Sequence, residues 1–367
     1  MKSNAIPSVH QVSTSPSIEN NFDLLRLLAA LQVVFCHAYE HLNIDHPFLN
    51  FIYNNVLKYF PGVPIFFCIS GFLIFWSFDR NQSKILVFFR NRFLRLYPAL
   101  WMCLIFTAVL LLICFPLVKS DLLSSFDFYK WLLAQASFFQ FYTPDLLRFW
   151  GVGTPNGSLW TIAVELQFYF FVPLLFLVLQ RAASKWKIIL FLFMVLSISA
   201  NIAVGFLVKE SMLHKLSNVF ILPYLYYFLI GVVLYKKWTF FANYFEGKFF
   251  LWIIVYVLYF VIFGNFLNFN ISSYWISNPF KIISDFLLIF CVVSFAFSKK
   301  NLSRRLLKGN DVSYGVYIYH MLIINSFLYF GFQKDVMHLV VALILSGVAG
   351  YLSWISIERR FLKRKAR

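Results

Sequence analysis

The amino-acid sequence predicts an all-α protein that crosses a membrane with about ten transmembrane helices. Of its 367 residues, 61% are hydrophobic and only 13% are charged, whereas a soluble domain carries about 25% charged residues. Apolar runs of roughly 17–25 residues, the length that spans a bilayer as a helix, recur along the whole chain. A soluble protein with one large core does not need ten separate runs of this length, so we interpret each run as a membrane span.

The predicted spans follow one another from the start of the chain to its end. They cover residues 22–41, 60–79, 97–118, 158–179, 188–208, 217–235, 249–267, 282–298, 311–332 and 338–357. The segment 119–157 is mixed and aromatic, and we expect an interfacial or re-entrant helix around residues 128–141.

Two short polar ends flank this region. Residues 1–21 are rich in Ser and Asn and lack the charged-then-apolar pattern of a signal peptide, so we expect a disordered cytoplasmic tail there. We expect residues 358–367 to form a basic cytoplasmic tail. Residues 22–357 then make up one integral membrane domain.

The distribution of Lys and Arg predicts the orientation. If the N-terminus lies in the cytoplasm, 23 of the 32 basic residues fall on the cytoplasmic side and 8 on the opposite side, with Arg26 inside a span. Short cytoplasmic loops of membrane proteins carry such an excess. Both termini are therefore expected in the cytoplasm, and the net charge of +17 needs no nucleic-acid partner.

The cysteines do not indicate a disulfide framework or a metal site. All five lie in or at the edge of apolar runs, and none forms a C-x-x-C pair. They are Cys36, Cys68, Cys103, Cys114 and Cys291.

Ionisable residues inside the predicted spans are few, and they are candidates for function because a buried charge in a membrane is costly. Arg26 and His37 in the first span are eleven residues apart. At 100° per residue both project from one helix face, and they are separated by roughly 16 Å along the axis. The spacing alone leaves open a plainer interpretation, in which Arg26 reaches toward lipid headgroups and His37 is held by a helix contact.

Glu165 in the fourth span is expected at a depth similar to that of His37. A carboxylate beside an imidazole fixes its tautomer and suits it to act as a general base. The alternative is a purely structural hydrogen-bonded pair.

Two further segments have a functional and a structural interpretation. Arg90, Arg92 and Arg95 precede the third span; their guanidinium groups match phosphate oxygens, but they also fit topology and headgroup contact. In the second span, Pro64 and the Ser70-Gly71 pair predict either an irregular helix that lines a cavity or close helix packing through small residues.

Taken together, these segments resemble the acyltransferase-3 family of integral membrane acyltransferases. Five motifs carry the resemblance in the right order over nearly the whole chain. They are Phe22-Asp23-Leu-Leu-Arg26 with His37, Gly62-Val-Pro-Ile-Phe-Phe-Cys-Ile-Ser-Gly-Phe-Leu73, Arg92-Phe-Leu-Arg95-Leu-Tyr-Pro98, Ser158-Leu-Trp-Thr-Ile-Ala-Val-Glu165-Leu-Gln-Phe-Tyr169 and Ser313-Tyr-Gly-Val-Tyr-Ile-Tyr-His320. A closing Ile357-Glu-Arg-Arg-Phe361 also fits, with Arg360 where the family usually has Pro.

The resemblance implies an O-acyltransferase in the bacterial inner membrane. Its donor would be acetyl-CoA or another acyl-CoA on the cytoplasmic side, and no metal is expected. Its acceptor would be a hydroxyl of an extracytoplasmic glycan such as O-antigen, capsule or exopolysaccharide. Some relatives add a periplasmic hydrolase-like domain, which is not expected after residue 357.

For such a transfer we expect individual residues to have distinct roles. His37, oriented by Glu165, would act as general base, or would carry the acyl group covalently. Arg26 would position the donor, and Arg92 and Arg95 would hold the coenzyme A phosphates. We expect six residues to line the substrate tunnel, namely Ser70, Trp160, Tyr169, Ser313, Tyr314 and His320, of which His320 is as readily structural as chemical.

Two other functions stay open at this stage. A transporter or flippase for a lipid-linked sugar would also need polar residues around a cavity, although no repeated halves are apparent. A scaffold subunit of a polysaccharide synthesis complex is the second. The sequence does not predict the acceptor hydroxyl, the length of the acyl chain or the oligomeric state.

Overall fold

The computed structural model describes residues 19–80, 84–114, 119–209, 211–299 and 301–364. Within these ranges the chain is helical and contains no β-strand. The all-α prediction is therefore confirmed. Most of the predicted tail, residues 1–18, lies outside the described residues.

The helices follow the predicted spans closely. Their bounds are α1 Phe22–His41, α2 Pro47–Asn55, α3 Gly62–Asp79, α4 Ile85–Cys114, α5 Lys119–Ser124, α6 Phe126–Ala136, α7 Trp160–Arg181, α8 Trp186–Gly205, α9 Met212–Ser217, α10 Leu225–Lys236, α11 Trp238–Phe245, α12 Phe249–Tyr259, α13 Pro279–Phe297, α14 Leu302–Leu307, α15 Ser313–Tyr329, α16 Val336–Ser353 and α17 Arg359–Leu362. Wider π-helical turns extend α12 over Phe260–Phe266 and join α16 to α17 over Trp354–Glu358.

Eight helical segments in the described part of the chain are long and apolar enough to cross a membrane. They are Phe22–His41, Pro47–Asp79, Ile85–Ile113, Gly157–Arg181, Ala183–Gly205, Phe249–Phe266, Pro279–Phe297 and Val336–Leu362. The shorter helices α10 and α15 correspond to the other two predicted spans. The protein is thus a polytopic membrane protein.

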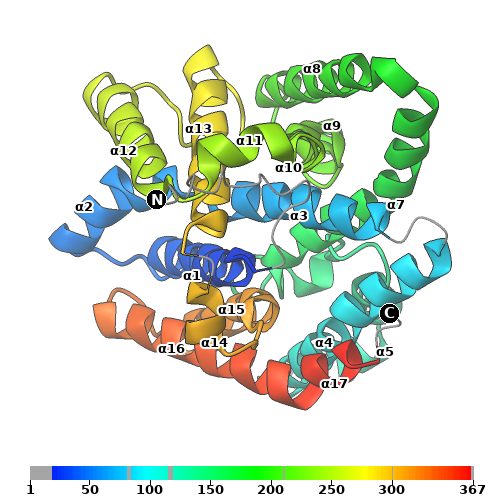
Figure 1. The fold of residues 1–367 in the computed structure, drawn as a ribbon. Coiled ribbons are helices and arrows are strands. Elements are labelled where there is room, and N and C mark those ends of the chain that lie inside the picture. Colours follow the sequence, from blue (N-terminus) through cyan, green and yellow to red (C-terminus); the bar gives the residue numbers. More distant parts are fainter. Residues whose placement is uncertain (1–18, 81–83, 115–118, 210, 300, 365–367) are drawn as a thin grey trace, which may run out of the picture.

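Large apolar side chains cover the outside of the fold. Phe191 and Leu192 of α8 are 64% and 59% exposed, and Phe250 and Leu251 of α12 are 67% and 56% exposed. Such a surface suits contact with lipid tails, which are as apolar as the side chains themselves. In Figure 1, α1 and α3 lie in the middle of the fold, with α8 and α12 on one side and α4 and α16 on the other.

Helix α3 is continuous through Pro64 and Ser70, and it both lines a cavity, described below, and packs closely on α10 through small residues. A Cβ atom on Gly71 would lie 2.0 Å from the carbonyl oxygen of Phe228 in α10. One on Gly231 would lie 2.3 Å from the carbonyl oxygen of Cys68. The two glycines therefore let the backbones of α3 and α10 touch where they cross.

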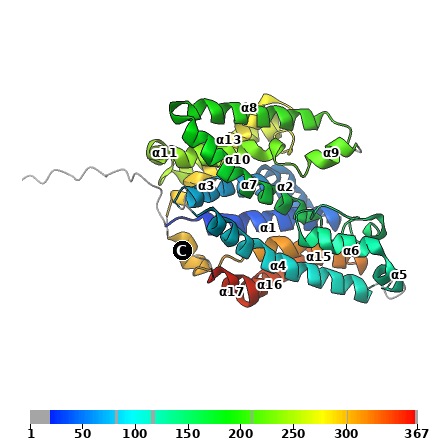
Figure 2. The ribbon, with the colours of Figure 1, turned by 90° about the vertical axis from the view of Figure 1, so that its right-hand side faces the viewer.

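The ends of the helices gather at two opposite ends of the fold. Figure 2 shows α11 and the C-terminus at one end, and α5, α6 and α9 at the other. The amide nitrogen of Asn21 donates to the carbonyl of Ser298 at 2.7 Å, and its oxygen accepts from the backbone N–H of Ser303 at 2.9 Å. The start of α1 thus lies beside the end of α13. We call the end of the fold that holds α11, the C-terminus and the start of α1 the basic end.

Three predicted boundaries differ from the structure. Asn21 is fully buried, so the folded domain begins before residue 22. Glu358 is also buried, and the helix continues to Leu362, so residues 358–362 belong to the last helix. The helix predicted at residues 128–141 is α6, which ends at Ala136.

Helix α4 begins at Ile85 rather than near residue 97. Hydropathy does not reveal this extension, because Arg90, Arg92 and Arg95 lower it. These arginines consequently lie on a helix that packs into the domain, and not in a loop.

Candidate active site

A cavity lies between α1, α3, α4, α7 and α15. Its lining combines arginines, hydroxyl groups and one carboxylate with apolar side chains. The lining residues are Arg26, Val63, Phe66, Phe67, Ser70, Ile74, Arg92, Arg95, Leu96, Thr161, Ile162, Glu165, Ser313, Tyr314 and Tyr317. Ligand sites usually have this character, with few polar groups in an apolar wall.

Three arginines meet in the cavity near the basic end. Arg95 forms an ion pair with Asp311 at 2.9 Å, and Arg26 lies 3.6 Å from the same carboxylate. Arg26 also pairs with Asp23 at 3.2 Å, although Asp23 is half exposed. Asp311 stands in the loop before α15, and it holds α1 and α4 against the start of that helix.

Arg92 is different because it has no carboxylate partner within ion-pair distance among the described residues. Its Nε atom is buried and makes no hydrogen bond. Its guanidinium carbon lies 5.4 Å from the ring centre of Phe88 and 5.7 Å from that of Tyr169. A buried guanidinium donor without an acceptor is costly, and an anionic ligand in the cavity would satisfy it.

Glu165 faces this cavity and accepts a hydrogen bond from the hydroxyl of Tyr169 at 2.5 Å. The predicted hydrogen bond between Glu165 and His37 is not formed. Helix α7 explains the difference, because it starts beside Tyr317: the Tyr317 hydroxyl lies 2.8 Å from Thr161 Oγ1. From there α7 runs toward the basic end and carries Glu165 with it.

The partner of His37 is His320. Nδ1 of His37 lies 2.9 Å from Nε2 of His320. The other ring nitrogen of His320, Nδ1, contacts the backbone carbonyl of Tyr317. His320 is fully buried, and the ring of His41 lies 5.6 Å from that of His37.

These contacts fix the tautomers of the neutral pair. A carbonyl oxygen only accepts, so Nδ1 of His320 carries a hydrogen and donates it. Nε2 of His320 then accepts from Nδ1–H of His37. The remaining nitrogen of His37, Nε2, is left with a free lone pair, which is what a general base or a nucleophile needs.

Comparison with known proteins identifies the family. An acyltransferase domain family matches residues 19–357. The chain is 32% identical over 353 residues to nodulation protein 10 of Rhizobium leguminosarum bv. viciae, which covers 94% of this chain and 93% of that protein. It is 28% identical over 356 residues to an O-acetyl transferase of Shigella phage Sf6, which covers 95% and 97%.

The chain belongs to the acyltransferase-3 family. The peptidoglycan O-acetyltransferase OatA of Listeria monocytogenes is 30% identical over 180 residues, which is 46% of this chain and 26% of that protein. No solved structure matches the chain. The protein is therefore a membrane acyltransferase, and the cavity and the histidine pair are its candidate active site.

The fold of this acyltransferase places most of the predicted site residues around one cavity. Those that line the cavity are Ser70, Arg26, Arg92, Arg95, Glu165, Ser313 and Tyr314. Tyr169 is not a lining residue, but its hydroxyl donates a hydrogen bond to Glu165, which is one. Trp160 does not line it and packs against Tyr224 instead, with ring centres 5.4 Å apart. His37 and His320 do not line the cavity either; His320 lies one helical turn past Tyr317, which does.

Sequence reasoning missed Asp311, Thr161 and Tyr317. The sequence does contain a signal for Asp311, because it is an acidic residue two positions before the Ser313-Tyr314 motif in a chain with only 15 acidic residues. Thr161 and Tyr317 stand inside recognised motifs, but nothing in the sequence shows that their hydroxyl groups meet.

No group of His, Cys, Asp and Glu in the described ranges has a geometry that would hold a metal ion.

Proposed function

We propose that this acyltransferase moves an acyl group, acetyl in the first instance, from cytoplasmic acyl-CoA to a hydroxyl of an extracytoplasmic carbohydrate. The observation that carries the proposal is an arginine-lined cavity that extends to Tyr317, whose backbone carbonyl contacts His320 of the His37–His320 pair. The printed names of the phage and Listeria relatives support O-acetyl transfer. The family and the basic loops support a bacterial inner membrane with both termini in the cytoplasm.

The three arginines supply the binding site for the donor. Arg92 and Arg95 hold phosphate oxygens of coenzyme A, since guanidinium forks match phosphate geometry. The unsatisfied Nε atom of Arg92 supports this role most directly. Arg26 lies on α1, the helix that also carries His37, and it positions the pantetheine arm.

The distance between the two parts of the site suits this donor. Arg26 and His37 are separated by eleven residues of α1, or roughly 16 Å. An extended pantetheine arm covers about this length, so the thioester reaches His37 while the nucleotide stays at the basic end. Coenzyme A then need not cross the membrane.

His37 performs the proton transfers at Nε2. It removes the proton from the acceptor hydroxyl while that oxygen attacks the thioester carbonyl carbon. The carbon–sulfur bond then breaks, and the thiolate takes the proton from His37 to leave as the thiol. A covalent route, in which Nε2 first accepts the acyl group, uses the same atom.

His320 replaces Glu165 as the residue that orients His37. The chain from the Tyr317 carbonyl through His320 to His37 fixes the ring and its tautomer, which is the role a carboxylate plays beside other catalytic histidines. Glu165 instead balances the charge of the arginines and orients Tyr169.

Donor binding tests this proposal without an acceptor. Acetyl-CoA should raise the melting temperature of the purified protein in detergent, because a ligand at about 100 times its Kd stabilises the folded state by about 2.7 kcal/mol. Arg92→Ala should abolish most of this shift and Arg90→Ala should keep it, since Arg90 is exposed on the same helix. A lipid-linked sugar that shifts the melting temperature while acetyl-CoA does not would favour the transporter instead.

A further inference from the structure

A second group of side chains lies at the end of the fold opposite the arginines. The loop 267–278 joins the end of α12 and its π-helical extension to α13, and it carries Tyr274 and Trp275. Helix α12 begins at the basic end, where the N–H of Phe249 donates to the hydroxyl of Ser298. The loop is therefore on the outer side of the predicted topology.

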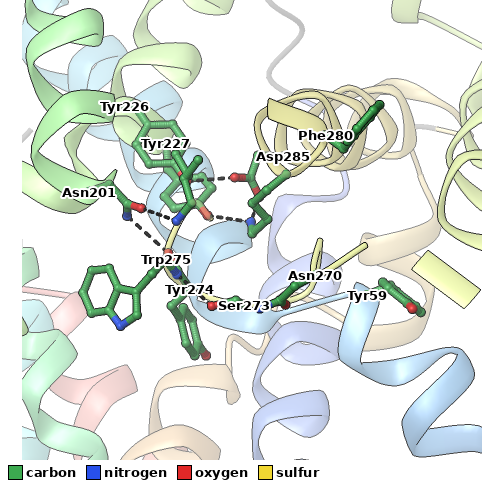
Figure 3. Close-up of polar contacts among 12 residues, drawn as sticks. Tyr59, Asn201, Tyr226, Tyr227, Asn270, Ser273, Tyr274, Trp275, Phe280 and Asp285 are labelled. Atoms are coloured by element: carbon green, nitrogen blue, oxygen red, sulfur yellow. Dashed lines mark hydrogen bonds and ion pairs between the residues drawn. The ribbon is translucent and has the colours of Figure 1, made fainter. Parts of the chain in front are cut away.

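The backbone on both sides of Trp275 is fixed by one buried residue. Asn201 of α8 is fully buried. Its Nδ2 atom donates to the carbonyls of Tyr274 at 3.2 Å and Pro223 at 3.0 Å. Its Oδ1 atom accepts from the N–H of Ile276 at 2.8 Å. Figure 3 shows Asn201 beside this loop, with the rings of Tyr274 and Trp275 pointing away from Tyr226, Tyr227 and Asp285.

The segment that follows the loop is equally well anchored. Lys281 and Asp285 of α13 form an ion pair, and their side chains are each 2% exposed. Asp285 also accepts a hydrogen bond from the hydroxyl of Tyr226 at 2.8 Å. The polar groups of this network satisfy one another, so it supports the loop rather than offering a free site.

The rings that project from the loop continue into a row of aromatic side chains. Trp275 lies 5.8 Å from Tyr224 and 6.0 Å from His214, measured between ring centres. Tyr224 in turn lies 5.4 Å from Trp160. Tyr224 itself is buried between them, so we call the three more exposed residues, Trp160, Tyr274 and Trp275, the aromatic ledge.

Trp160 connects this ledge to the catalytic histidine. It directly precedes Thr161 in α7, and Thr161 Oγ1 lies 2.8 Å from the hydroxyl of Tyr317. The backbone carbonyl of Tyr317 contacts His320, the partner of His37. At the other end of the ledge, Tyr274 is 40% exposed.

Polar groups that can form hydrogen bonds lie beside His37 on α1. Glu40 is exposed and accepts a hydrogen bond from the hydroxyl of Tyr53. The His41 ring is 5.6 Å from that of His37. Flat aromatic faces beside carboxylate, imidazole and phenol groups suit a sugar ring, whose C–H face packs on the aromatic rings while its hydroxyls form hydrogen bonds.

We propose that the aromatic ledge binds a sugar ring of the acceptor glycan and presents one of its hydroxyls to His37. This inference rests on the proposed function and adds to it the place where the acceptor binds. The ledge and the arginine cavity then approach His37 from opposite ends, as a transfer between two sides of a membrane requires. The rigid attachment of the loop reduces the entropy lost on binding.

Glycan binding in the absence of a donor tests the ledge separately from catalysis. The probe is a soluble surface-polysaccharide fraction that has been de-O-acetylated with mild alkali, titrated into wild-type protein and the variants Tyr274→Ala and Trp275→Ala. One aromatic contact contributes up to about 1.5 kcal/mol, so each variant should weaken binding about tenfold. Phe269→Ala is the matched control, because Phe269 is an exposed ring in the same loop that stacks on Phe280 at 4.4 Å.

Steady-state kinetics completes the test. In the ledge variants the KM for the glycan should rise about tenfold, while the KM for acetyl-CoA stays at its wild-type value. Wild-type glycan affinity and KM in both variants would overturn the ledge and leave the acyltransferase proposal intact. Loss of glycan binding in both variants, in a protein that releases no coenzyme A, would support the ledge and contradict the proposed reaction.

Discussion

Nδ1 of His37 lies 2.9 Å from Nε2 of His320, although 283 positions separate the two residues in the sequence. Helices α1 and α15 run in the same direction, since Arg26 approaches Asp311 near the start of both and His37 meets His320 further along. The ion pair and the histidine pair thus hold these helices in register. Through Tyr317, whose side chain lines the cavity and whose carbonyl contacts His320, the arginine-lined cavity is linked to the proposed catalytic base.

Removing His320 tests whether it positions the base. His320→Ala should lower kcat by about 10²-fold, the smaller end of what a positioned proton acceptor contributes, and leave the KM for acetyl-CoA unchanged. His320→Gln should recover part of the rate, because its amide oxygen accepts from Nδ1–H of His37. The pH–rate profile of the Gln variant should shift, since its partner no longer titrates. An unchanged kcat in the Ala variant would make His320 a packing residue.

Removing Arg92 tests the phosphate site. Arg92→Ala should raise the KM for acetyl-CoA by about 10- to 100-fold, because a hydrogen bond to a charged group contributes about 1.5–3 kcal/mol. Arg92→Lys should restore it only partly, since an ammonium group lacks the planar fork. Arg90→Ala, on the exposed side of the same helix, should leave KM as it is. Equal effects of Arg90→Ala and Arg92→Ala on KM would mean that both arginines serve membrane topology and that neither binds the donor specifically.

The contact between α3 and α10 makes a prediction about stability. Gly71→Ala should destabilise the protein by about 1–3 kcal/mol, the usual cost of overpacking, because the new methyl group would meet the Phe228 carbonyl at 2.0 Å. Gly347→Ala is the control, since a Cβ atom there has nothing within 4 Å and alanine favours a helix. Thermal unfolding in detergent measures both; a melting temperature of Gly71→Ala equal to that of Gly347→Ala would refute the close crossing.

The orientation is tested by reporters for the two sides of the membrane. An enzyme that is active only in the periplasm should be inactive when fused after Arg367 and active when inserted in the loop 267–278. A fluorescent reporter that folds only in the cytoplasm should give the reverse pattern. Periplasmic activity after Arg367 would overturn the ten-span topology and would place the arginine cavity on the wrong side for cytoplasmic acyl-CoA.

The membrane fold could be predicted well from the sequence, because a helix that crosses a bilayer must be apolar and hydropathy measures this property directly. Helix α1 has the predicted bounds of residues 22–41, and Arg26 and His37 both face α15, as their spacing implies. The start of α4 was missed because a helix can carry arginines into a protein interior when a residue such as Asp311 compensates them.

The pairing of His37 was not accessible from the sequence. The expectation that Glu165 meets His37 assumes that the first and fourth spans start at the same depth in the membrane. Helix α7 instead starts beside Tyr317. The depth at which a helix starts in the membrane depends on how it packs against its neighbours, and the hydropathy of that helix alone does not reveal it.

Release of free coenzyme A from acetyl-CoA tests the central claim most directly. Purified wild type and His37→Ala are each measured with and without the de-O-acetylated surface polysaccharide. We expect release that depends on the glycan in wild type and is lost in His37→Ala, while acetyl-CoA still raises the melting temperature of the variant. Glycan-dependent release at the wild-type rate in His37→Ala would contradict the assignment of the base and the direction of transfer built on it.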